Sequence, residues 1–166
     1  MDFTIRAVRP EEYEALGELT ASIYLNDGLL KYGAQDSYLE VLRDTARRAR
    51  ESEVLVAEDA DGRLVGGVTF ATGNTPWADI AVAGEAEFRM LAVAREARGR
   101  GVGEALVRTC VERARALPGC ERIVLSTDTT MVAAHRMYDR LGFVRTPHRD
   151  WSPIRDHLLL TYALEF

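Results

Sequence analysis

The stretch that most constrains this chain joins an apolar run to a glycine-rich turn. The run FRMLAV at residues 88–93 is followed by polar residues and then by RGRGVG at residues 98–103, which opens an amphipathic segment that ends at Pro118. This order predicts a strand, a turn and a helix. A helix start carries unpaired N–H groups and partial positive charge, and glycines allow an anion to approach the backbone closely. Arg98 and Arg100 add charged donors, so the stretch predicts a phosphate or pyrophosphate site.

Two other phosphate-binding motifs do not fit this stretch. A dinucleotide-binding turn needs a third glycine where Glu104 stands, and a carboxylate there would repel the ligand. A P-loop needs Gly-Lys-Ser/Thr, and Lys31 is the only lysine in the chain. A flexible turn with solvated arginines is the alternative interpretation of the glycine triplet when it is considered by itself.

The rest of the chain alternates strand and helix patterns. The predicted strands cover residues 3–8, 54–58, 64–71, 85–93 and 122–127, with one more beginning at 143 and a last one at 158–166. The predicted helices cover residues 10–24, 37–50, 101–117 and 131–141; the second has a basic outer face, and Gly142 ends the fourth. Strands and helices mixed in this order predict the α/β class, a mixed sheet with helices on its faces. No linker or repeat interrupts the chain, so we expect a single domain over residues 1–166.

Composition excludes several classes of partner. The chain has 166 residues and a net charge of −5, which disfavours nucleic acid or an anionic membrane as partner. No apolar run reaches the ~20 residues of a membrane helix, and the first residues lack the apolar core of a secretory signal. Cys110 and Cys120 have no metal-ligand spacing, so we expect no metal and a reducing, cytoplasmic location.

Two blocks of residues resemble the GNAT superfamily of N-acetyltransferases. The spacing of Arg98, Gly101 and Gly103 after the strand is similar to the acetyl-CoA signature of that family. The second block, Ala134, Tyr138 and LGF at residues 141–143, matches the Ala-x-x-x-Tyr…Leu-Gly-Phe pattern of its members. The run RDWSP at residues 149–153 resembles that of many bacterial members, which suggests a bacterial source.

The resemblance implies a fold and a co-substrate. The expected fold is a mixed sheet of about six to seven strands, splayed between the fourth and fifth, with about four helices. The expected co-substrate is acetyl-CoA, with backbone pairing of Leu91 and Val93 to pantetheine and with the amides from Arg98 or Gly99 through Glu104 holding the pyrophosphate. The residues expected to contact the cofactor are Leu91, Ala92, Val93, Arg98, Gly99, Arg100, Gly101, Val102, Gly103, Glu104, Met131, Ala134 and Tyr138. Met131 departs from the pattern, because many members have asparagine there.

Acetyl transfer needs a neutral amine and a stabilised thiolate leaving group. An alkylamine has a pKa near 10.4 and is almost entirely protonated at neutral pH. Glu87 is the candidate base, since it lies on the strand that carries a catalytic carboxylate in the family; Glu85 and Asp79 are weaker candidates, and a purely structural Glu87 is the alternative. Tyr138 is the candidate proton donor to the thiolate. The alternative for Tyr138 is a core tyrosine.

The sequence therefore predicts an acetyl-CoA-dependent N-acetyltransferase. The acetyl group would pass directly from the CoA thioester to a primary amine of a small molecule or peptide. A non-catalytic acyl-CoA-binding sensor is the alternative function, and Met131 keeps it open. The family often forms dimers, so a homodimer is one expectation.

Overall fold

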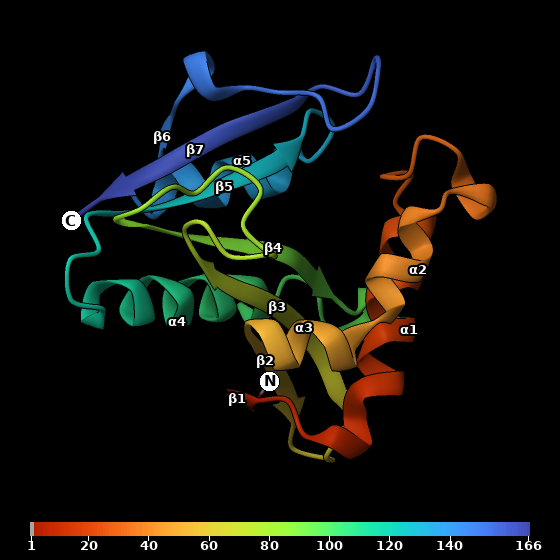
Figure 1. Cartoon of the computed structure of the whole chain (residues 1–166). Helices are drawn as coiled ribbons and strands as arrows, with labels where there is room; N and C mark the ends of the chain where they lie inside the picture. Colours follow the sequence, from red (N-terminus) through yellow and green to blue (C-terminus); the bar gives the residue numbers. More distant parts are fainter. Residues whose placement is uncertain (1) are drawn as a thin grey trace. The chain divides into compact units, whose positions relative to one another are not determined.

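The computed structural model describes residues 2–166 and shows a mixed α and β fold, as predicted (Figure 1). The strands are β1 (Phe3–Ala7), β2 (Glu53–Asp59), β3 (Leu64–Thr72), β4 (Glu85–Val93), β5 (Arg122–Asp128), β6 (Val144–Arg145) and β7 (Leu159–Glu165). The α-helices are α1 (Tyr13–Asn26), α2 (Tyr38–Arg43), α3 (Thr45–Glu51), α4 (Val102–Ala116) and α5 (Val132–Arg140). The seven strands form a sheet in the order β1-β2-β3-β4-β5-β7-β6, in which β4 and β5 run parallel.

The chain forms two compact units, and each unit is built from two separate stretches of the sequence. One unit contains the chain up to Phe70 together with Met90–Cys110, and the other contains Ala71–Arg89 together with Val111–Phe166. Strands β3 and β4 and helix α4 each continue from one unit into the other. The expectation of a single domain over residues 1–166 stays a prediction. Within residues 2–166 no helix is both long and apolar enough to cross a bilayer.

In the first unit, α1 packs on β2 and on the helices that follow it. Leu16 of α1 contacts Val54 and Val56, which alternate with outward residues along β2. Gly17 brings α1 close to the end of α2, because a Cβ at this position would lie 2.5 Å from the carbonyl oxygen of Arg43. Only glycine allows this approach without displacing the backbone.

The helix predicted over residues 37–50 is two helices. Asp44 separates α2 from α3, with φ −83° and ψ 63°, and its side chain accepts a hydrogen bond from the Arg47 amide. An aspartate in this position caps the next helix rather than continuing the last one. Arg48 donates to the carbonyl oxygens of Val41 and Leu42 at 2.9 Å each, so it satisfies the end of α2. Residues 2–166 therefore contain five α-helices where about four were expected.

In the second unit, β5 lies between β4 and β7. Three residue pairs join β4 to β5, from Glu85↔Arg122 to Glu87↔Val124, and the ladder described over residues 2–166 ends there. Antiparallel pairing with β7 continues along the whole of β5. Helix α5 packs on this part of the sheet through Tyr138, and Gly142, with φ 94°, follows its end as predicted.

Candidate functional site

The glycine-rich turn of the first unit leaves open space at the start of α4. Gly99 and Gly101 have φ values of 77° and 85°, a left-handed conformation that favours glycine. A Cβ placed on either residue would meet no atom within 4 Å. The first hydrogen bond of α4 runs from the Ala105 amide to the Gly101 carbonyl at 3.0 Å. The first amides of an α-helix have no acceptor within the helix, and those of Val102 and Gly103 fit an anion such as a pyrophosphate.

The two arginines of this turn differ in their surroundings: Arg98 forms an ion pair, and Arg100 is exposed. Arg98 donates to the Asp27 carboxylate at 2.7 Å, and Arg95 lies 3.7 Å from the same carboxylate. Asp27 follows the end of α1, and sequence reasoning did not identify it because nothing in the local pattern links it to a residue 71 positions away. Arg100 is exposed. Backbone amides, rather than the Arg98 guanidinium, are thus the donors the turn offers most directly.

Strand β4 has an irregular backbone at Met90. Met90 is buried and has φ 55°, a left-handed conformation that is uncommon for a residue with a side chain. Leu91 and Val93 after it are half-buried, whereas Ala92 is buried. A left-handed residue turns the neighbouring peptide out of the regular ladder direction. The Leu91 amide is therefore the backbone donor whose direction Met90 affects most.

Tyr138 lies in an aromatic cluster on α5 in the second unit. Its ring centroid is 6.0 Å from that of Phe88, 5.8 Å from Phe143 and 5.6 Å from Tyr162. Burial raises the pKa of the Tyr138 phenol well above its ordinary value, and Tyr162 adds to the shift. The phenol therefore keeps its proton at neutral pH and can donate a hydrogen bond.

The other predicted residues of α5 lie at the start of the helix. Met131 occupies the N-cap position and makes no capping hydrogen bond through its side chain, as expected for a thioether in place of an amide. Ala134 is half-buried one turn before Tyr138. A small residue there leaves space beside the phenol.

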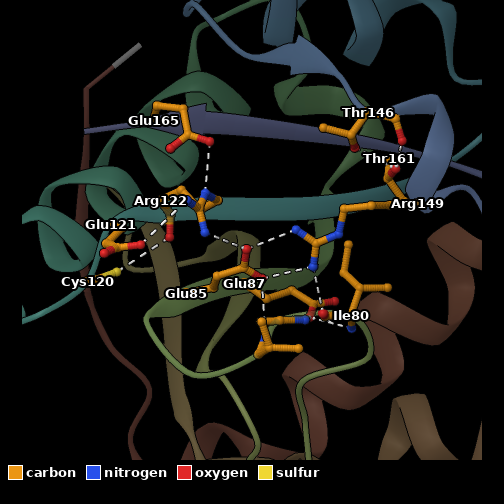
Figure 2. Close-up of polar contacts among 12 residues, drawn as sticks. Ile80, Glu85, Glu87, Cys120, Glu121, Arg122, Thr146, Arg149, Thr161 and Glu165 are labelled. Atoms are coloured by element: carbon orange, nitrogen blue, oxygen red, sulfur yellow. Dashed lines mark hydrogen bonds and ion pairs between the residues drawn. The ribbon is translucent and has the colours of Figure 1, made fainter.

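Glu87 is fully buried, with 0% of the residue exposed (Figure 2). Its Oε1 accepts hydrogen bonds from the amides of Ile80 and Ala81, both at 2.9 Å. Its Oε2 has no hydrogen-bond partner within residues 2–166. Burial raises the pKa of the Glu87 carboxyl to about 7; the two amide hydrogen bonds oppose this shift, and nearby Asp79 adds to it. Glu87 is thus a carboxyl that can change charge near neutral pH.

Glu85 and Asp79, the weaker candidates for the base, are paired with arginines. Glu85 forms ion pairs with Arg149 at 2.8 Å and Arg122 at 3.0 Å, and Asp79 pairs with Arg89 at 3.0 Å. Burial would raise the pKa of Glu85, but the hydrogen bonds from Arg149, the Val82 amide and Arg122 lower it overall. The negative charge of each carboxylate is therefore balanced by an arginine of the same chain. Sequence reasoning missed Arg149, since its run gave no indication of its partner.

Comparisons with known proteins agree with this geometry. An N-acetyltransferase of Methanocaldococcus jannaschii, itself uncharacterized, is 34% identical over 85 residues, which are 51% of this chain and 49% of the relative. The chain thus spans about half the length of the curated relative it matches.

Solved structures share the fold over nearly the whole chain. A GNAT-family acetyltransferase of Staphylococcus aureus Mu50 has a TM-score of 0.73 at 18% identity and covers 99% of both chains. The yncA protein of Salmonella typhimurium, determined with its cofactor acetyl-CoA, has a TM-score of 0.70 at 20% identity and covers 99% of this chain and 94% of its own. The model of the acetyltransferase (GNAT) family matches residues 14–143, which is most of the sequence. This chain therefore belongs to the acetyltransferase (GNAT) family.

Proposed function

We propose that this protein is an acetyl-CoA-dependent N-acetyltransferase that acetylates a primary amine of a small molecule or peptide. The observation that carries the proposal is the turn before α4, where two left-handed glycines leave open space beside the amides that begin the helix. Acetyl-CoA supplies the activated acetyl group and carries a pyrophosphate of matching charge. The amides of residues 99–104 would bind that pyrophosphate, with Arg100 as the exposed guanidinium beside them.

Tyr138 would donate a hydrogen bond to the thiolate that leaves. Its pKa is raised by burial, so full proton transfer to the leaving thiolate, whose conjugate thiol has a pKa of about 8.5, is unfavourable. The phenol instead stabilises the developing negative charge through a hydrogen bond, and the aromatic rings around it hold its position. The Leu91 amide, next to the left-handed Met90, would donate to the developing oxyanion.

Glu87 would accept the proton of the attacking amine through Oε2. A pKa of about 7 suits a group that takes up a proton near neutral pH. Because side chains alternate along a strand, Glu87 points to the face of β4 opposite Phe88, which contacts Tyr138. The proposed base and acid thus belong to opposite faces of the strand. Since Ile80 and Ala81 cover the carboxyl, a water would relay the proton.

Acetyl-CoA should raise the melting temperature of the protein, because it binds only the folded state. At 100 times the dissociation constant the added stability is about 2.7 kcal/mol. We expect Gly101→Val to abolish this shift, since its side chain would fill the open space at the turn. Differential scanning fluorimetry with and without acetyl-CoA measures the effect.

Gly119→Val is the matched control for that experiment. Gly119 also has a left-handed φ, 77°, and its added Cβ would likewise meet no atom within 4 Å. It should lose similar intrinsic stability and keep the full acetyl-CoA shift. An undiminished shift in a folded Gly101→Val protein would show that the turn does not bind the cofactor.

Tyr138→Phe should lower kcat about ten- to a thousandfold and leave the dissociation constant of acetyl-CoA nearly unchanged, because the hydroxyl acts mainly as the thiolate forms. Steady-state kinetics with a good acceptor and calorimetric titration of acetyl-CoA check the two parts. A variant that turns over at the wild-type rate rules out the leaving-group role.

The raised pKa of Glu87 predicts a pH-dependent stability. The folded state binds its proton more tightly than the unfolded state, so the free energy of unfolding should fall as the pH rises from about 4.5 to 7. The full effect is at most about 3 kcal/mol. Glu87→Gln cannot ionise, so it should gain stability relative to wild type between pH 5 and pH 8 in urea denaturation. Parallel profiles for the two proteins would contradict the assigned pKa.

A further inference from the structure

Arg149 connects two segments that are far apart in the sequence (Figure 2). It belongs to the 3-10 helix η4 (Pro147–Arg149), and its guanidinium donates to both carboxylate oxygens of Glu85, at 2.8 and 2.9 Å. The same group donates to the carbonyl oxygen of Ile80 at 2.8 Å. A planar guanidinium can make these three contacts at once, whereas an ammonium group cannot match the fork.

The segment Trp77–Val82 is held along β4 by alternate side chains of that strand. The Val82 amide donates to Glu85 at 3.1 Å, and the amides of Ile80 and Ala81 donate to Glu87. Arg89 completes the series by donating to the Trp77 carbonyl at 3.0 Å and pairing with Asp79. Residues 85, 87 and 89 share one face of β4 because side chains alternate along a strand.

This face of β4 is the one opposite Tyr138. Phe88, which contacts the Tyr138 ring, points the other way from its neighbours Glu87 and Arg89. Arg149 adds a contact to the carbonyl of the Ile80–Ala81 peptide, whose N–H, that of Ala81, donates to Glu87.

The backbone next to Arg149 is held in place by hydrogen bonds of the two residues that follow it. The next residue, Asp150, accepts two hydrogen bonds from Arg145 at 2.8 Å each and one from the Thr161 amide at 2.8 Å. Trp151 pairs with Leu159 through two backbone hydrogen bonds, and its indole donates to Ser126 at 2.9 Å. The run RDW at residues 149–151 is therefore fixed to β5 and β7, and this fixes the backbone position of Arg149.

We propose that Arg149 is a positioning residue for the acceptor amine, because it fixes Trp77–Val82 as a wall of the acceptor site on the face of β4 opposite Tyr138. The inference rests on the proposed acetyl transfer. If the phenol stabilises the leaving thiolate on one face and Glu87 takes the amine's proton on the other, the amine approaches beside this segment. Arg149 would thus influence the acceptor without touching the cofactor.

The test compares Arg149→Lys with Arg122→Lys. Lysine keeps the charge of Arg149 but cannot bind Glu85 and the Ile80 carbonyl together. Arg122 also donates to Glu85, at 3.0 Å, but its hydrogen bonds described within residues 2–166 go to glutamates and not to Ile80, so it is the matched control. We expect Arg149→Lys to raise the KM of the acceptor about tenfold and to change the dissociation constant of acetyl-CoA less than about twofold. Hydrogen exchange of the amides of residues 80–82 should speed up about tenfold. The control should leave all three quantities close to wild type.

Several results would overturn the inference. If hydrogen exchange of the amides of residues 80–82 is unchanged in Arg149→Lys, Arg149 does not fix the segment Trp77–Val82, whatever the activity of the variant. Faster exchange with an unchanged acceptor KM means that the segment does not border the acceptor. Equal changes in Arg149→Lys and Arg122→Lys mean that the contacts with Glu85 matter and that the bond from Arg149 to the Ile80 carbonyl does not. A wild-type protein that releases no thiol with any amine, while its segment loosens as expected in Arg149→Lys, instead refutes the proposed function and with it the acceptor role.

If Arg149→Lys does not fold, Glu85→Gln decides the question. It removes the ionic partner but leaves the bond from Arg149 to the Ile80 carbonyl in place. A rise in acceptor KM smaller than about tenfold, together with faster exchange of the Val82 amide, supports the inference. A wild-type KM in a variant with faster exchange overturns it.

Discussion

The alternation of side chains along β4 is the constraint on which the account depends. One face of the strand presents Phe88 to the ring of Tyr138, and the other presents Glu85, Glu87 and Arg89 to Trp77–Val82. A slip of one residue in register would exchange these faces and place three charged groups against an aromatic cluster. The parallel ladder with β5, from Glu85↔Arg122 to Glu87↔Val124, fixes the register.

Burial of charge sets the chemistry of the face of β4 that carries Glu85 and Glu87. Glu85 remains ionised because Arg122 and Arg149 provide partners, whose attraction offsets part of the cost of removing the carboxylate from water. Glu87 accepts hydrogen bonds from two amides, and desolvation outweighs these bonds and raises its pKa to about 7. Two glutamates separated by one residue thus take different roles, the first as an anchor for arginines and the second as a group that can exchange a proton.

Much of the fold could be predicted because its signals are local. Strand β4 has the predicted bounds, and α4, the hairpin of β2 and β3, and the left-handed Gly142 follow from apolar periodicity and turn residues. The break at Asp44 was missed because Asp44 can cap α3 only if α2 ends just before it. The end of α2 is in turn stabilised by the buried Arg48, which donates to the Leu42 carbonyl oxygen. A basic face was expected where Arg48 is in fact buried.

The candidate site could be predicted only as a set of motifs. The glycine turn and Tyr138 carry sequence patterns, but the bond from Asp27 to Arg98 and that from Arg149 to Glu85 join residues 71 and 64 positions apart. No local pattern specifies such pairs, and a single sequence contains no other signal for them. The assignment of Glu87 as base stays a prediction, since its carboxyl is covered by Ile80 and Ala81.

The most direct test of the account is the release of free thiol from acetyl-CoA in the presence of a panel of primary amines, with the product analysed by mass spectrometry. The account predicts thiol release that depends on both protein and amine, with one acetyl group gained by the amine for each thiol released. A protein that binds acetyl-CoA tightly and shows no amine-dependent release with any acceptor would be a sensor rather than an enzyme, and would contradict the account.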